Sequence, residues 1–426
     1  MDTQRWLFLV VLLALLAACG GDTGSGSAPA ISYEVFTTSG GDPSYPADGQ
    51  GAINRGLLRL LDRATDSSEV HIAIFDWTAP LVAERLAENL RRHAGMQASV
   101  IIDPKNYADE RVPRRKAARS RFQGMIRNHP DQFRIVNEEN PQAGLLHTSE
   151  FSPRRQMHNK FFLFRHLSPG TNDRGDYTIA VSSANLTATE IGESNEMVVI
   201  HGDSGLYSRF LAYWQAMAVS ELDFSFGTTH TFSDQHDHLA YFFPKSVPGD
   251  EVAGILRSLK SGLEQSREPA KVRIAMSIWH RCRKILAHQL VKMQREHELD
   301  VRILLKEDLD IALEVKQILD SLPEGSVRFL PSRNPELAYG LHSKLMLVEG
   351  PFARNEGGEI QREHLTFTGS HNWNYDAHRY NSETWIRIAD EGVHATLETH
   401  WQELWEKGID STQMYRGVNY DSTGCR

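Results

Sequence analysis

The stretch Met157-His158-Asn159-Lys160-Phe161-Phe162-Leu163-Phe164 recurs later in the chain as Leu341-His342-Ser343-Lys344-Leu345-Met346-Leu347-Val348. Each copy places a His-x-Lys pair at the start of an apolar run, which is typical of a buried β-strand. One such pair arises readily by chance, so the repetition is the informative feature. It predicts a duplicated chain in which each half contributes one histidine and one lysine.

Further landmarks follow each pair in the same order. Ser182-Ser183-Ala184-Asn185 in the first half corresponds to Gly369-Ser370-His371-Asn372 in the second. A glutamate lies 11 residues past each asparagine and a tryptophan 18 residues past each glutamate, at Glu196 with Trp214 and at Glu383 with Trp401. This matched spacing extends the repeat over most of the chain.

Ahead of these landmarks, both halves alternate strands with helices. Apolar and alternating runs predict strands at 70–75, 98–103 and 133–136, and again at 272–277, 301–305 and 327–330, with helices over 81–93 and 285–294. Strand-helix-strand units of these lengths imply an α/β fold with a parallel or mixed sheet in each half. The expected domain limits are a leader at 1–19, a tether at 20–48, a first half at 49–225, a linker at 226–239, a second half at 240–410 and a tail at 411–426.

The leader has the features of an export signal. An apolar run from Trp6 to Ala18 is too short to span a bilayer and ends at Leu16-Ala17-Ala18-Cys19, which resembles the lipobox of bacterial lipoproteins. We expect Cys19 to be lipidated and the protein to be anchored in the bacterial cell envelope, with the outer membrane favoured; an ordinary cleaved signal would make it secreted. Cys282 and Cys425 either form a disulfide in that compartment or remain free.

Strand geometry suggests how the paired residues could share one pocket. Residues two apart on a strand point to the same face, so His158 should project with Lys160, and Ser183 with Asn185. The second half offers the matched set His342, Lys344, Ser370 and Asn372. If the halves meet about a pseudo-twofold axis, two imidazoles face each other among lysines and amides.

Such a pocket suits a phosphodiester. Lysines and amides can hold the non-bridging oxygens, one imidazole can attack phosphorus, and the other can protonate the leaving alkoxide. Each histidine needs its other ring nitrogen held by an acceptor, for which Glu196 and Glu383 are the candidates. Because the lysines supply positive charge, we expect no metal and no other cofactor.

These residues resemble the phospholipase D superfamily, whose signature is His-x-Lys-x4-Asp followed by Gly-Ser-x-Asn, present twice. The resemblance covers roughly Ile53 to Trp405 and implies two α/β/α halves with mixed sheets, metal-independent phosphodiester chemistry, His158 as nucleophile and His342 as general acid. Both motifs lie in one chain, so a monomer is expected. Arg165 and Glu349 replace the motif aspartate, which in the family supports the motif, and Ser182 replaces the glycine of the first half.

The substrate stays open at this stage. The membrane tether favours phospholipid headgroups, by hydrolysis or transfer, whereas the basic stretch from Arg111 to Phe122 favours an exported nuclease unless it is only a solvated helix face. The net charge of −9 gives no overall attraction for nucleic acid. A non-catalytic envelope binding protein is the third alternative. His230, His236 and His238 in the linker lack regular metal-ligand spacing and are read as polar linker residues.

Overall fold

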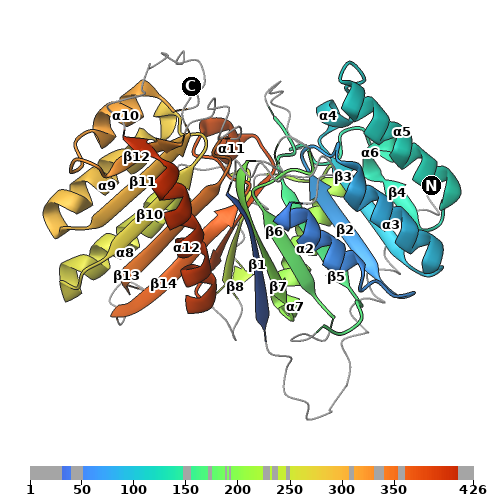
Figure 1. Ribbon diagram of the computed structural model, residues 1–426, viewed down its shortest axis with the longest axis horizontal. Coiled ribbons are helices and arrows are strands. Elements are labelled where there is room, and N and C mark those ends of the chain that lie inside the picture. Colours follow the sequence, from blue (N-terminus) through green and yellow to red (C-terminus); the bar gives the residue numbers. More distant parts are fainter. Residues whose placement is uncertain are drawn as a thin grey trace, which may run out of the picture. The chain divides into compact units, whose positions relative to one another are not determined.

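Two mixed sheets, one from each half, organise the computed structural model (Figure 1). The structure describes residues 31–39, 51–146, 155–170, 175–187, 190, 193–223, 231–232, 238–245, 250–306, 311–330, 340–353 and 360–410. Cys19, Cys425, His230 and His236 lie outside these residues, and Cys282 is disulfide-bonded. Within the described part of the chain, no helix is both long and apolar enough to cross a membrane.

The first sheet has seven strands. In spatial order they are β1 (Ser32–Ser39), β7 (Ser194–His201), β6 (Thr178–Ser182), β5 (Lys160–Arg165), β2 (Glu69–Ile74), β3 (Gln97–Ile102) and β4 (Phe133–Ile135). Strands β2, β3 and β4 are parallel, and the other pairings are antiparallel.

The second sheet repeats this order and extends it to nine strands. They are β16 (Ile409–Asp410), β12 (Val327–Leu330), β11 (Asp300–Lys306), β10 (Lys271–Met276), β13 (Lys344–Ala353), β14 (Ile360–Gly369), β15 (Glu383–Ile388), β9 (His238–Phe243) and β8 (Thr231–Phe232). The parallel strands β10, β11 and β12 correspond to β2, β3 and β4. The predicted α/β class and its duplication are confirmed.

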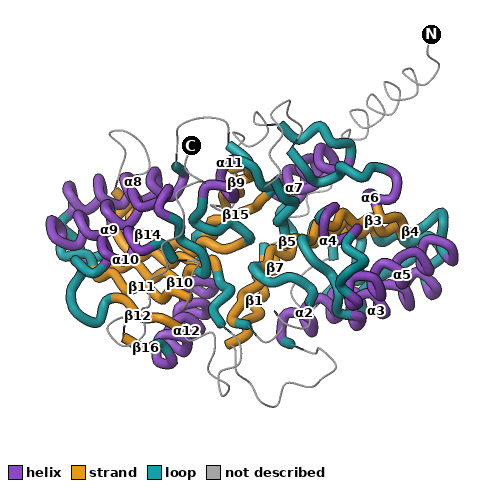
Figure 2. Tube along the Cα trace, turned by 90° about the horizontal axis from the view of Figure 1, so that it is seen from above, coloured by secondary structure: helices purple, strands orange, loops and turns teal. Residues whose placement is uncertain are grey.

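Helices cover both faces of each sheet, because the strands alternate their apolar side chains. Ile72 and Ile74 of β2 share a core with the helices on one face, whereas Ala73 packs with α7 on the other; Ile274 and Ala275 of β10 divide in the same way. Figure 2 shows α3 and α5 running side by side in the first half. The helices are α2 (Ala52–Leu61), α3 (Pro80–Arg92), α4 (Pro104–Ala108), α5 (Pro113–Asn128), α6 (Val136–Glu139), α7 (Ser204–Ala218), α8 (Glu251–Ser266), η3 (Arg281–Arg283), α9 (Lys284–His297), α10 (Leu313–Leu319), α11 (Tyr375–Arg379) and α12 (Glu391–Lys407).

One apolar core joins the halves. It contains residues of β5 and α7 together with residues of β13 and α12, such as Leu163 and Leu347. The paired tryptophans close this core with the same bond: Trp214 donates its indole N–H to Ile72 O at 2.9 Å, and Trp401 donates to Ile274 O at 2.9 Å. The repeat in the sequence is therefore a repeat of contacts as well as of strands.

Two expectations about connecting segments need correction. Residues Ser32–Ser39, assigned to a tether, instead form β1 along β7, because Tyr33 and Val35 pack on the shared core. The stretch expected as a linker contributes β8 and the first residues of β9 to the second sheet. His238 is buried there, bonded through Nδ1 to Asp203 at 2.9 Å and through Nε2 to the Tyr33 hydroxyl at 2.6 Å.

Candidate functional site

Each His-x-Lys segment docks on the opposite half. The His158 backbone N–H donates to Ser382 O at 2.9 Å, and the His342 N–H donates to Ser194 O at 3.1 Å. Both acceptors lie immediately before or at the start of the strand that carries the paired glutamate, β15 or β7. The repeat therefore exchanges contacts across the two halves, as expected for a pseudo-twofold arrangement.

His158 has a carboxylate behind its ring. Its Nδ1 lies 2.9 Å from Oε2 of Glu383, which is fully buried, and the Phe75 ring packs against the imidazole edge at 4.8 Å between centroids. Burial lowers the pKa of His158, and the negative charge of Glu383 opposes that shift. The structure thus places Glu383 where an orienting carboxylate would have to be, and its hydrogen bond leaves Nε2 as the ring nitrogen available for chemistry.

His342 has a different partner. Its Nδ1 lies 2.9 Å from Asn195 Oδ1 and 3.7 Å from the Glu190 carboxylate. The expectation that Glu196 would hold this ring is wrong. Glu196 Oε1 instead accepts from the Lys344 backbone N–H at 3.1 Å and from Thr368 Oγ1 at 2.9 Å, so it braces the strand behind the histidine.

The electrostatic surroundings of the two histidines differ accordingly. Burial first, and then Lys344, Lys160, Lys306 and His158, lower the pKa of His342 well below its usual value. Among the described residues, no carboxylate is hydrogen-bonded to His342 to offset this shift, whereas Glu383 partly offsets it at His158. Each ring is held by a side chain of the opposite half, Glu383 or Asn195, so both histidines lie where the two halves meet.

Each lysine of the repeat contacts the backbone of its own histidine. Strands β5 and β13 begin only at Lys160 and Lys344, so strand alternation does not govern the histidines before them. Lys160 Nζ donates to the His158 carbonyl at 2.8 Å, and Lys344 Nζ donates to the His342 carbonyl. Burial lowers the pKa of Lys160 to about 8, although nearby carboxylates act in the opposite direction. Burial, followed by the charge of Lys160, lowers the pKa of Lys344 to about 7, again against nearby carboxylates.

The two asparagines and the two serines of the repeat follow the ends of β6 and β14. Asn185 Oδ1 accepts from the Asp76 N–H at 3.2 Å, and Asn372 Oδ1 accepts from Ser277 Oγ at 2.9 Å. Ser183 Oγ donates to Asn195 Oδ1 at 3.0 Å, the atom that also contacts His342.

Ser370 Oγ donates to Thr384 O at 3.3 Å and accepts from the Thr384 N–H at 3.0 Å. The two serines, which we expected in the pocket, therefore tie neighbouring strands together.

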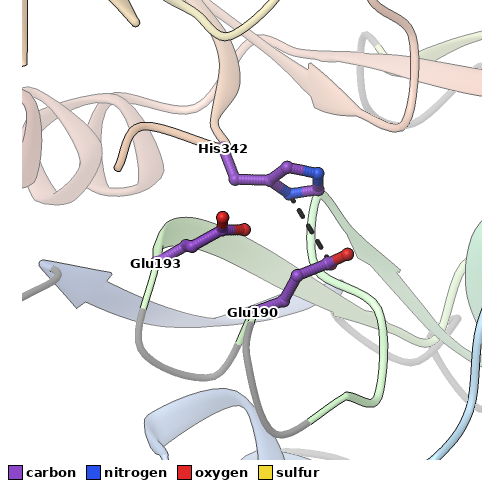
Figure 3. Close-up of side chains that lie close together, drawn as sticks. All are labelled: Glu190, Glu193 and His342. Carbon is purple, nitrogen blue, oxygen red and sulfur yellow. Dashed lines mark ion pairs between the residues drawn. The ribbon is translucent and has the colours of Figure 1, made fainter. Parts of the chain in front are cut away.

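Two glutamates lie next to His342 that the repeated sequence pattern did not predict. Glu190 and Glu193 approach the ring from the segment that follows Asn185 (Figure 3). Burial, and secondarily the charge of Glu190, raises the pKa of Glu193 to about 7. Glu190, Glu193 and His342 each have one possible metal-ligand atom within 4.8 Å of the other two. These residue types can bind a metal ion, but Lys344 and Lys306 already bring positive charge to Glu193.

The two positions of the missing motif aspartate lie far along their strands from the histidines. Glu349 is five residues past Lys344 on β13, and Lys271 Nζ binds it at 2.6 Å across the strand pair. In the first half the matched positions carry Arg165 and Glu69, which also pair across the strands, at 4.0 Å. The first half therefore carries a cross-strand ion pair at the same place, with its charges exchanged relative to Lys271 and Glu349.

A second grouping of metal-ligand type lies at this same place. It consists of Glu349, His394 and Glu398. The Lys271 ammonium lies between the two carboxylates, 2.6 Å from Glu349 and 2.9 Å from Glu398. The lysine therefore supplies the cation there.

A cavity of about 530 Å³ lies beside the segment that precedes His158. The turn that carries it is attached to that segment, because Asp103 Oδ2 accepts from the Met157 N–H at 2.9 Å and Lys105 Nζ donates to Arg155 O at 3.3 Å. Its lining includes the apolar side chains of Pro104, Tyr107, Pro141 and Leu145, the cationic ones of Lys105, Arg119 and Arg155, and the carboxylate of Glu138, which lies 3.7 Å from Arg119. The cavity therefore offers apolar surface together with charged groups, of which three are cationic and one is anionic.

The basic stretch begins two residues before α5, continues into that helix, and is partly neutralised. Arg115 pairs with Asp76 at 2.7 Å and with Asp109 at 3.3 Å, and Arg119 hydrogen bonds to Glu110 at 3.1 Å. Arg114 and Lys116 remain exposed. This helix therefore offers less free positive charge than its sequence suggests.

Comparisons with known proteins agree with this architecture. The family model described as "Cardiolipin synthase, PLD-like domain" matches residues 57–218 and 259–405, one segment in each half. No curated protein matches the sequence significantly.

Among solved structures, phosphatidylserine synthase from Haemophilus influenzae Rd KW20 aligns with a TM-score of 0.56 at 10% identity, over 90% of this chain and 89% of that one. Polyphosphate kinase from Porphyromonas gingivalis aligns with a TM-score of 0.50 at 11% identity, over 87% of this chain and only 50% of that one, so the chain spans half of the kinase. At these identities the likeness to both structures is one of fold.

Proposed function

Because the chain belongs to the phospholipase D superfamily, a family of phosphodiesterase-type enzymes, we propose that it cleaves phospholipid headgroups through a phosphohistidine intermediate. The observation that supports this most directly is that two histidines lie where the halves meet, each with Nδ1 held from the opposite half: His158 by Glu383 and His342 by Asn195. That arrangement leaves Nε2 of both rings for the two steps of the reaction.

The unequal partners support a division of roles. The Glu383 carboxylate increases the basicity of His158 and neutralises the charge that its ring acquires on phosphorylation, so His158 is the nucleophile. His342, held by a neutral amide, is a stronger acid once protonated and is suited to give its proton to the leaving oxygen. Lys160 and Lys344 stabilise charge at the phosphoryl group.

The two steps need only the substrate, the two histidines and water. Nε2 of His158 forms a bond to phosphorus as the bond to the leaving oxygen breaks, and that oxygen takes the Nε2 proton of His342. Water then attacks phosphorus, gives a proton to His342, and releases His158 with the phosphate product. Another alcohol in place of water would give headgroup transfer.

The cavity beside the segment that precedes His158 supports a lipid substrate over a nucleic acid. Arg155, three residues before His158, lines this cavity, and we take the cavity to receive the part of the substrate that stays on phosphorus. Apolar lining with cationic groups at Lys105 and Arg155 suits the glycerol and ester region of a phospholipid. Exposed Arg114 and Lys116 of α5 keep an exported nuclease as the second candidate.

The lipobox-like segment supports a place for this activity. We propose that Cys19 anchors a monomeric enzyme to the envelope, on the periplasmic side of the outer membrane, where phospholipid is the adjacent phosphodiester.

Substitution of each histidine tests the proposal. His158→Asn should abolish turnover of phosphatidylglycerol and phosphatidylcholine. It should also prevent formation of the covalent phosphohistidine intermediate on the enzyme. His342→Asn should also lose turnover but recover part of it with a p-nitrophenyl phosphodiester, whose leaving group needs no proton. Isolation of a phosphorylated His342 peptide would reverse the assignment.

A substrate panel separates the remaining alternatives. Turnover of DNA or RNA but of no lipid would establish the nuclease. Binding of lipid with no turnover of any phosphodiester would establish the non-catalytic binding protein. Single variants that each lose less than about tenfold in kcat, roughly 1.4 kcal/mol, would refute the two-histidine mechanism.

A further inference from the structure

The carboxylate of Glu190 occupies hydrogen-bond donors that a substrate phosphate would need, and we propose that Glu190 is a built-in competitor for that phosphate. The inference rests on the proposed function, since it takes the site between His158 and His342 to receive a phosphodiester. It makes Glu190 a residue that sets the affinity for substrate.

Asn185 makes two bonds to this carboxylate. Its backbone N–H donates to Oε2 at 2.6 Å, and its side-chain Nδ2 donates to Oε1 at 2.6 Å. Bonds this short are expected where the acceptor carries a charge. The two non-bridging oxygens of a phosphodiester present the same kind of anionic pair, so Glu190 fills the donor pair in the resting protein.

The charge of Glu190 also lies among the groups that would meet the phosphate. Its Oε2 is 3.7 Å from His342 Nδ1 (Figure 3). Burial lowers the pKa of Lys160 and of Lys344, and Glu190 acts on both in the opposite direction. An incoming phosphate would therefore meet lysines whose charge is already partly balanced.

The second half does not share this feature. The residue five past Asn372 is Ala377 in α11, where the first half has Glu190 five past Asn185. Among the described residues, no carboxylate is bonded to the Asn372 side chain, whose Oδ1 accepts from Ser277. The fold therefore holds the second asparagine without a carboxylate. This argues against a purely structural need for Glu190.

Titration of inorganic phosphate by calorimetry tests the proposal without requiring catalysis. Glu190→Gln keeps the size of the side chain and removes its charge, and phosphate should bind about tenfold more tightly, since a like charge within a few ångströms shifts an ionic equilibrium by about that much or more. Glu190→Asp keeps the charge but shortens the reach to the two donors, and should give a smaller gain. Glu84→Gln, an exposed glutamate of α3, removes the same charge away from the site and should leave the affinity unchanged.

Steady-state kinetics give the second readout. With a turned-over lipid, Glu190→Gln should lower KM by a similar factor, because the competing charge is removed from the free enzyme. Phosphate affinity that is unchanged or weaker in both folded variants, judged by thermal melting, would overturn the proposal. A lower kcat at unchanged KM would also overturn it, because Glu190 would then be a positioning residue for His342.

The two readouts distinguish this inference from the proposed function. If the wild type turns over no phosphodiester but Glu190→Gln still tightens phosphate binding, the function fails and the competitor role stands. If the wild type is active and the titrations coincide, only the competitor role fails. If none of the proteins binds phosphate, the competitor role fails, and the turnover assay alone decides the proposed function.

Discussion

The hydrogen bond between Glu383 and His158 gives the sharpest single test of the site. Glu383→Gln preserves the shape of the side chain but replaces the carboxylate 2.9 Å from Nδ1 with a neutral amide, at a fully buried position. A buried hydrogen bond to a charged group contributes roughly 1.5–3 kcal/mol. If that interaction acts on the phosphorylated state, kcat should fall by roughly 10- to 150-fold.

The pH dependence supplies a sign as well as a size. His158 must be neutral to attack, so activity is lost as pH falls through its pKa in the free enzyme. Glu383 favours the protonated ring and holds the pKa of His158 above the value that burial alone would give. Removing the charge lowers this pKa, so the acid limb of the kcat/KM profile should move to lower pH while the plateau drops.

Glu196→Gln is the matched control, because Glu196 is the repeat-related glutamate and is equally buried. It braces Lys344 and Thr368 and does not bond to either imidazole, so its substitution should lower thermal stability and leave the acid limb in place. An acid limb that stays put in Glu383→Gln, or a loss of kcat smaller than about threefold, would refute the reasoning.

Three further outcomes are expected. Glu349→Gln breaks the partly buried ion pair with Lys271 and should cost about 1 kcal/mol in the free energy of unfolding, with kcat unchanged within twofold, because Glu349 lies five residues along β13 from Lys344; a tenfold loss of kcat would place it in the site after all. Activity should survive EDTA, because the lysines supply the positive charge; complete loss that Zn²⁺ or Ca²⁺ restores would contradict this. Cys19→Ser should release the protein from membrane fractions or stall its processing, and unchanged membrane association with an unchanged mature mass would remove the anchor.

The sequence predicted most of the parts that the repeat duplicates. His158, Lys160 and Asn185 have counterparts at matched spacing, and a duplicated strand order follows from the strand and helix patterns around them. Strand β1 was missed because it has no counterpart among those landmarks, although Tyr33, Val35 and Phe36 are an apolar set of strand type.

The partner of His342 was beyond the reach of the repeat. Asn195 and Glu196 are adjacent on β7, and which of them meets the histidine depends on how the opposite half docks, not on spacing along the chain. Symmetry favoured the glutamate, whereas the structure uses the asparagine. Glu190 was missed for a related reason, since a repeat cannot indicate a residue that only one copy has.

Because each histidine is held by the other copy, fusion of the copies has a consequence for how such a site can evolve. A homodimer of identical halves would have to give both histidines the same acceptor, since every substitution appears twice. In a single chain the two acceptors can differ, as Glu383 and Asn195 do. Gene fusion thus frees the nucleophile and the acid to be tuned independently, at the cost that neither half alone carries a complete histidine site.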